Sequence, residues 1–81
     1  IPVLHELSHL PVIADPSHAT GKAKLVAPMS NAIAASGADG LMIEVHNDPM
    51  NALCDGAQSL TPDQFDEVAR QVLRIREVIG K

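Results

Sequence analysis

Three side chains that could bind a divalent cation stand at separate points of the sequence: His18, Glu44 and Asp55. His46 follows Glu44 by two residues, so both would share one face of an extended strand, because successive strand side chains alternate. One imidazole and two carboxylates suit borderline ions such as Mn²⁺, Fe²⁺, Co²⁺ or Zn²⁺. The pattern therefore indicates a metal site, with His46 beside it as a ligand-facing donor or as a group that orients Glu44.

A purely structural interpretation of the same residues stays open from spacing alone. His18 could cap a turn, Glu44 could pair with a lysine, and Asp55 could be a turn residue. His46 could equally be a solvated loop histidine. Cys54 adjoins Asp55, and because adjacent residues rarely both reach one ion, we expect an ordinary buried thiol there.

Two short apolar segments predict the strands that would position these side chains. Residues 11–15 come shortly before His18, and residues 40–45 contain Glu44. The second segment places one apolar face toward an expected layer of helices, formed by Leu41, Ile43 and Val45. At the carboxyl ends of parallel strands, where α/β proteins build their sites, the polar side chains could meet.

Helical periodicity predicts helices over residues 1–8 and 23–36 and after Thr61. Thr61-Pro62-Asp63-Gln64 is a helix start, with Thr61 as the N-cap and Gln64 able to close a capping box. The last helix then carries one apolar stripe, made of Phe65, Val68, Val72, Ile75 and Ile79.

Loops are predicted over residues 16–22 and 46–60, the second with one short turn around residues 50–53. The order helix, strand, helix, strand, helix indicates parallel strands joined by crossover helices. Two strands form neither a barrel nor a stable sheet alone, and 81 residues bury a small core. We therefore expect residues 1–81 to be an incomplete part of a single larger domain.

The composition narrows the classes of partner. A net charge of −4 gives no basic surface for nucleic acid, and no apolar run approaches the length of a membrane span. A single cysteine excludes an internal disulfide and favours a reducing, cytoplasmic setting. Lys22 and Lys24 follow Gly21 at a helix start, where they could meet a phosphate or simply be solvated.

Several stretches together resemble a known family. These are Leu-Pro-Val-Ile-Ala-Asp-Pro-Ser-His at 10–18, Gly-Ala-Asp-Gly-Leu-Met-Ile-Glu-Val-His at 37–46, and Ala-Leu-Cys-Asp-Gly with Gln-Ser-Leu at 52–60. The combined pattern resembles the C-terminal part of 3-deoxy-7-phosphoheptulonate synthase (DAHP synthase) of class I. The short microbial form, related to 3-deoxy-octulosonate 8-phosphate synthase, is the most similar type.

The resemblance implies a fragment of a (β/α)₈ TIM barrel, comprising its last two strands with helices six to eight. It implies a transferase that condenses phosphoenolpyruvate with erythrose 4-phosphate in the shikimate pathway of aromatic amino acid biosynthesis. The family's histidine, glutamate and aspartate metal ligands fall on His18, Glu44 and Asp55. Its cysteine ligand lies on the first barrel strand, so Cys54, which replaces a more usual serine, is not that ligand. The catalytic assignment is His46, which could interact either with phosphoenolpyruvate or with a metal-bound water.

Because one ligand and the family's phosphate-binding residues lie elsewhere in the barrel, we expect the isolated chain to be inactive and to bind metal weakly. One alternative is 3-deoxy-octulosonate 8-phosphate synthase, which uses arabinose 5-phosphate. Another is a non-catalytic packing or regulatory segment beside a fused chorismate mutase domain, with a contact face formed by Arg70, Arg74 and Arg76. Exposed strand edges and apolar faces favour a homo-oligomer.

Overall fold

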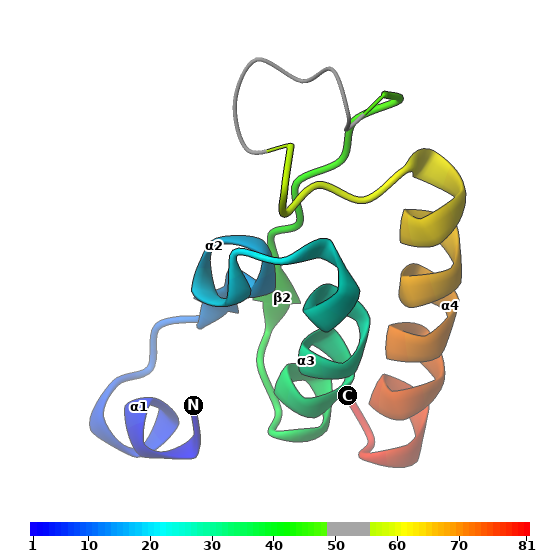
Figure 1. The fold of residues 1–81 in the computed structure, drawn as a ribbon. Coiled ribbons are helices and arrows are strands. Elements are labelled where there is room, and N and C mark those ends of the chain that lie inside the picture. Colours follow the sequence, from blue (N-terminus) through cyan, green and yellow to red (C-terminus); the bar gives the residue numbers. More distant parts are fainter. Residues whose placement is uncertain (49–55) are drawn as a thin grey trace.

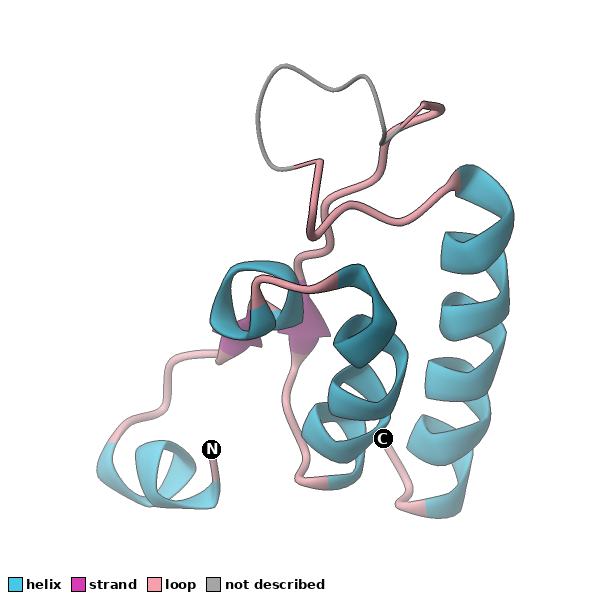
Figure 2. Cartoon of the chain, in the orientation of Figure 1, coloured by secondary structure: helices cyan, strands magenta, loops and turns pink. Residues whose placement is uncertain are grey.

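The structure, a computed structural model, describes residues 1–48 and 56–81, and this part of the chain forms four helices and two strands. They are α1 (Pro2–Leu7), β1 (Ile13–Ala14), α2 (Pro16–Thr20), α3 (Ala23–Ala35), β2 (Gly40–Leu41) and α4 (Pro62–Val78). Figure 1 shows α3 and α4 side by side, with β2 next to α3. The architecture is a small parallel sheet with helices, coloured by type in Figure 2.

The two strands pair in parallel, with Ile13 opposite Gly40 and Ala14 opposite Leu41. This pairing confirms the crossover arrangement predicted from the order of elements. Both strands are shorter than predicted, because β1 runs into α2 at Pro16, which has no N–H to donate. The extended chain after β2 regains a parallel partner only at Val45, which bridges to Leu60.

The prediction of a loop over residues 16–22 is wrong, because residues 16–20 form α2. Asp15 caps this helix: its Oδ1 atom accepts a hydrogen bond from the backbone N–H of His18 at 2.9 Å. Pro16 occupies the first helical position, where a missing N–H costs nothing. Gly21 ends the helix with a φ of 65°, the left-handed conformation that favours glycine.

The capping box predicted at the start of α4 is confirmed. Thr61 Oγ1 accepts from the backbone N–H of Gln64 at 3.2 Å, and Gln64 Oε1 accepts from the backbone N–H of Thr61 at 2.9 Å. The predicted helix over residues 23–36 is also present, as α3. None of the described helices is long and apolar enough to cross a membrane.

A small core holds α3, α4 and the sheet together. Its buried members are Val26, Leu60 and Val68, and partly buried side chains packed against them include Ile43 and Val72. The predicted apolar stripe of α4 therefore faces the core through its middle residues, whereas Phe65 at one end is 39% exposed. Such a core is the size expected of a short chain.

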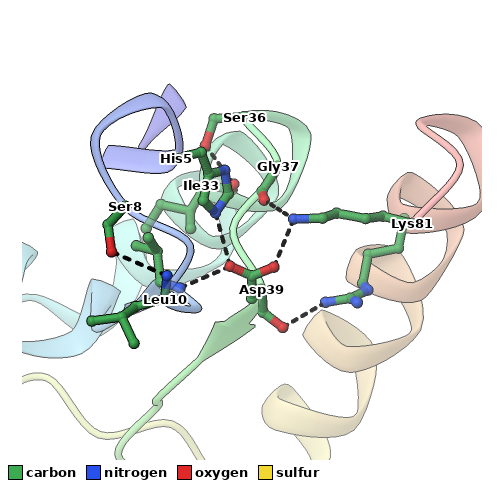
Figure 3. Close-up of polar contacts among 10 residues, drawn as sticks. His5, Ser8, Leu10, Ile33, Ser36, Gly37, Asp39 and Lys81 are labelled. Carbon is green, nitrogen blue, oxygen red and sulfur yellow. Dashed lines mark hydrogen bonds and ion pairs between the residues drawn. The ribbon is translucent and has the colours of Figure 1, made fainter. Parts of the chain in front are cut away.

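Asp39, just before β2, ties three distant parts of the chain together (Figure 3). Its Oδ2 atom accepts from His5 Nε2 at 2.8 Å and from the backbone N–H of Val12 at 2.7 Å. Its Oδ1 atom accepts from Lys81 Nζ at 2.8 Å, and Arg76 donates to its carbonyl oxygen at 3.0 Å. The hydrogen bonds to the carboxylate, led by that from Lys81, lower the pKa of Asp39.

Candidate metal-binding site

The structure brings His18 and Glu44 together beyond the carboxyl ends of the two strands. α2, which follows β1 directly, carries His18, and the extended chain after β2 carries Glu44. His18 Nε2 lies 3.9 Å from Glu44 Oε1, and the two side chains are 50% and 38% exposed. Because the strands are parallel, residues 26 positions apart in sequence reach one edge of the sheet.

Asp55 and Cys54 lie outside the described residues, so the predicted third ligand has no described position. Over residues 1–48 and 56–81, no three His, Cys, Asp or Glu side chains gather closely enough to hold a metal ion. Within the same ranges, the side chain that lies beside the Glu44 carboxylate is that of His18 rather than that of a lysine. The described part of the candidate site is thus one imidazole and one carboxylate.

Ser17 fixes the backbone at Glu44, a role that the sequence analysis missed. Its hydroxyl accepts a hydrogen bond from the backbone N–H of Glu44 at 2.9 Å, and the residue is 0% exposed. The paired part of the sheet ends before Glu44. The Ser17 hydroxyl therefore accepts the hydrogen bond that a carbonyl oxygen of a neighbouring strand would otherwise accept. In the sequence, the only signal for this role of Ser17 is its position between Pro16 and His18.

Asp15 holds the His18 side chain as well as capping α2. Its Oδ2 atom lies 2.5 Å from His18 Nδ1, while Oδ1 accepts from the His18 backbone N–H. The backbone hydrogen bond from His18 is the largest influence on the Asp15 carboxyl and lowers its pKa. Burial comes second and raises the pKa, and the side-chain contact with His18 lowers it further, so that the net pKa is lowered. The carboxylate is therefore ionised near neutral pH.

His46 is held by its backbone and by its ring. Its N–H donates to the Leu60 carbonyl at 2.9 Å, and the Leu60 N–H donates to the Glu44 carbonyl at 3.0 Å. This parallel bridge keeps residues 44–46 extended, which puts Glu44 and His46 on the same side of the chain. His46 Nδ1 accepts from the backbone N–H of Asp48 at 2.9 Å, so a neutral ring carries its proton at Nε2.

The donor atoms of His18 and Glu44 fit a divalent ion. Metal–ligand distances of about 2.0–2.2 Å place two neighbouring ligand atoms about 3.0–3.5 Å apart. The observed separation of 3.9 Å is slightly larger, so a small shift of either side chain would bring both atoms onto one ion. Lys22 and Lys24, the candidate phosphate-binding residues, are both exposed.

This site lies at the strand ends of a parallel α/β unit, and comparison with known proteins identifies its family. A profile of the DAHP synthetase I family matches residues 1–80. The chain therefore belongs to the DAHP synthetase I family.

Individual relatives agree with this assignment. Phospho-2-dehydro-3-deoxyheptonate aldolase of Thermotoga maritima is 41% identical over 80 residues, which cover 99% of this chain and 24% of the relative. 2-dehydro-3-deoxyphosphooctonate aldolase of Desulfotalea psychrophila is 33% identical over 98% of this chain and 32% of the relative. The chain thus spans about a quarter to a third of the length of these relatives.

Solved structures match the fold closely. The crystal structure of the Thermotoga maritima DAHP synthase superposes with a TM-score of 0.95 over 99% of this chain and 24% of that one. A truncated form of the same enzyme also superposes with a TM-score of 0.95, and the match covers 30% of its chain. The unit of helices and parallel strands therefore matches a part of that structure.

Proposed function

We propose that this chain is part of a DAHP synthase, a transferase that condenses phosphoenolpyruvate with erythrose 4-phosphate. The products would be 3-deoxy-D-arabino-heptulosonate 7-phosphate and phosphate, at the first step of the shikimate pathway. The observation that carries the proposal is the meeting of His18 and Glu44 at the strand ends, in a chain of the DAHP synthetase I family. A single cysteine in the chain supports a cytoplasmic setting.

We also propose that residues 1–81 form the last two strands and helices six to eight of one (β/α)₈ catalytic domain. Surfaces that a larger domain would cover support this. An apolar cavity of about 430 Å³ lies between α3, β2 and α4, lined in part by Leu41, Phe65 and Val72. On α1, Val3 and Leu7 are exposed, and this helix has no buried residue.

In the proposed site, His18, Glu44 and Asp55 hold a divalent ion of the Mn²⁺, Fe²⁺, Co²⁺ or Zn²⁺ group. Such an ion supplies Lewis-acid polarisation of the aldehyde of the four-carbon sugar phosphate. Ser17 and Asp15 position the two described ligands through the hydrogen bonds given above. His46 would donate a hydrogen bond from Nε2 toward phosphoenolpyruvate, because its Nδ1 is already the acceptor of the Asp48 N–H.

The second candidate is 3-deoxy-octulosonate 8-phosphate synthase, acting on arabinose 5-phosphate. Relatives named 2-dehydro-3-deoxyphosphooctonate aldolase match at 33–39% identity, below the 41% of the heptonate enzyme. The Asp15-Pro16-Ser17-His18 turn and the Gln58-Ser59-Leu60 ending also favour the four-carbon acceptor. Rates of the complete protein with each aldose phosphate decide between the two.

A packing or regulatory role beside a chorismate mutase domain, with a face of three arginines, has less support. Arg76 points back to the Asp39 carbonyl within its own chain, and Arg70 pairs with Asp66 at 2.7 Å. Of the three arginines, Arg74 alone has no such hydrogen bond or ion pair with another described residue. A homo-oligomer remains our expectation for the complete protein, and light scattering of that protein tests it.

The metal site is tested with chelator-treated complete protein, titrated with Mn²⁺ and assayed with both substrates. We expect Mn²⁺ to restore turnover, and His18→Ala and Glu44→Gln each to weaken Mn²⁺ binding at least tenfold. Glu6→Gln, which alters an exposed acid on α1, is the control and should bind like the parent. The 81-residue chain alone should bind weakly and give no turnover; wild-type affinity in both ligand variants would overturn the proposal.

A further inference from the structure

We propose that Asp15 sets the tautomer of His18, so that the neutral ring carries its proton at Nδ1 and presents the Nε2 lone pair toward Glu44. Asp15 is thus a positioning residue that acts through His18. Its part in metal binding rests on the proposed function; the tautomer itself is a separate, measurable property.

The two oxygens of Asp15 both face hydrogen-bond donors of one residue. Oδ1 accepts from the His18 backbone N–H at 2.9 Å, and Oδ2 lies 2.5 Å from His18 Nδ1. An ionised carboxylate can only accept hydrogen bonds, so the ring nitrogen beside it must be the donor. The cap also stops the carboxylate from turning away, because rotation would break the hydrogen bond that starts α2.

The position of this proton decides what His18 offers on its other side. A neutral imidazole has one N–H, so a proton at Nδ1 leaves a lone pair at Nε2, 3.9 Å from Glu44 Oε1. Two acceptor atoms then face the same space, an arrangement that a cation between them stabilises. The opposite tautomer would direct an Nε2–H at the carboxylate, and a hydrogen bond would occupy the position that an ion needs.

The capping role alone does not require a carboxylate. Serine, threonine, asparagine and aspartate all cap helices well. Aspartate and asparagine differ in the atom that faces the ring. Aspartate places an oxygen, which accepts a hydrogen bond, against His18 Nδ1, whereas asparagine would place an NH₂ group, which donates one, at the same position. Nδ1 would then have to accept, and the proton would move to Nε2. Asp15→Asn therefore reverses the tautomer while it preserves the cap.

The test is ¹⁵N NMR of the histidine rings in metal-free complete protein, at a pH of about 8.5 where an ordinary histidine is neutral. We expect His18 to be protonated at Nδ1 in the parent and at Nε2 in Asp15→Asn. Asp15→Ser keeps a cap without touching the ring and should give a mixture of tautomers. His46 is an internal reference, because the Asp48 N–H holds it in the opposite tautomer in all three proteins.

Co²⁺ titration of the same proteins provides the second measurement. Loss of such an orienting partner typically weakens metal binding about 10- to 100-fold, which is the loss expected for Asp15→Asn. An Nε2-protonated His18 in the parent, or an unchanged tautomer in Asp15→Asn, would overturn the inference. A reversed tautomer in a protein that binds no Co²⁺ would support the role of Asp15 and overturn the proposed metal function instead.

Discussion

The hydroxyl of Ser17 accepts a hydrogen bond from the backbone N–H of Glu44 at 2.9 Å, beyond the end of the paired strands. Ser17 precedes His18 in α2, so this one contact joins the segments that carry both described candidate ligands. It replaces the ladder hydrogen bond that β1 can no longer supply after Pro16. The distance between His18 and Glu44 therefore depends on a buried side chain that need not touch an ion.

Replacing Ser17 with alanine should destabilise the fold and loosen Glu44. The Glu44 N–H would lose its partner in a part-buried position, which costs about 1–3 kcal/mol. Denaturant unfolding should show this loss, and hydrogen exchange should show faster exchange of the Glu44 amide. Metal affinity should fall with it, because one ligand is held less firmly.

Ser30→Ala is the matched control for this variant. Ser30 is also 0% exposed, but its hydroxyl has no hydrogen-bond partner among the described residues. Removing an unpaired buried hydroxyl should be neutral or slightly stabilising. Equal losses in the two serine variants would show that the Ser17 contact does not hold Glu44.

Acid should destabilise the fold through Asp39. Its pKa in the folded chain is lowered from 3.8 by hydrogen bonds from Lys81, the Val12 N–H and His5. A depressed pKa means that the unfolded chain binds more protons, so stability is fully present above 3.8 and is lost as pH falls below it. In thermal unfolding followed from neutral pH to about pH 2, Tm should hold steady until the pH approaches 3.8 and decline below it, and Asp39→Asn should flatten this decline.

Lys81→Gln separates the effect of Asp39 from that of other acids. Lys81 donates both to Asp39 Oδ1 and to the Gly37 carbonyl, so its loss removes the first cause of the lowered pKa. The variant should flatten the acid decline in part, and adding Asp39→Asn should flatten it further, but by less than Asp39→Asn does in the parent. Fully additive effects would contradict a shared contact.

Removing the cap of α4 should cost about 1 kcal/mol. Thr61→Ala deletes the Oγ1 atom that accepts from the Gln64 backbone N–H, whereas Thr61→Ser keeps it. Because the relatives are three to four times as long as this chain, 1 kcal/mol corresponds to a Tm decrease of about 2–4 °C or less in the complete protein. Calorimetry of the two variants tests this, and a serine variant as unstable as the alanine variant would point to the lost methyl group instead.

The comparison of two helix starts shows what the sequence could reveal about the fold. At Thr61-Pro62 the cap, the first-position proline and the capping box predicted α4 correctly. Asp15-Pro16 carries the same cap and proline, and α2 was nevertheless predicted as a loop, because five residues give no helical periodicity to detect. Both strands were placed correctly, but their lengths depend on where a partner strand ends, which is a tertiary property.

The site could be predicted only in part for a similar reason. His18 and Glu44 are reactive residue types near predicted strand ends, so their meeting could be expected. Ser17 and Asp39 act through contacts 27 or more residues away, and nothing local distinguishes them from ordinary loop residues. His5 is a similar case, because it donates to Asp39, 34 residues away, from a helix with no buried residue.

His46→Phe in the complete protein should separate the two roles considered for this histidine. If His46 donates from Nε2 toward phosphoenolpyruvate, loss of a hydrogen bond to a charged group, about 1.5–3 kcal/mol, should reduce turnover about 10- to 100-fold. Metal affinity should stay within about twofold of the parent, because the bridge that holds Glu44 uses backbone atoms of residue 46 rather than its ring. His46→Gln keeps a donor and should recover part of the rate. A large loss of Mn²⁺ affinity in His46→Phe would show that the ring acts on Glu44 instead of on the substrate.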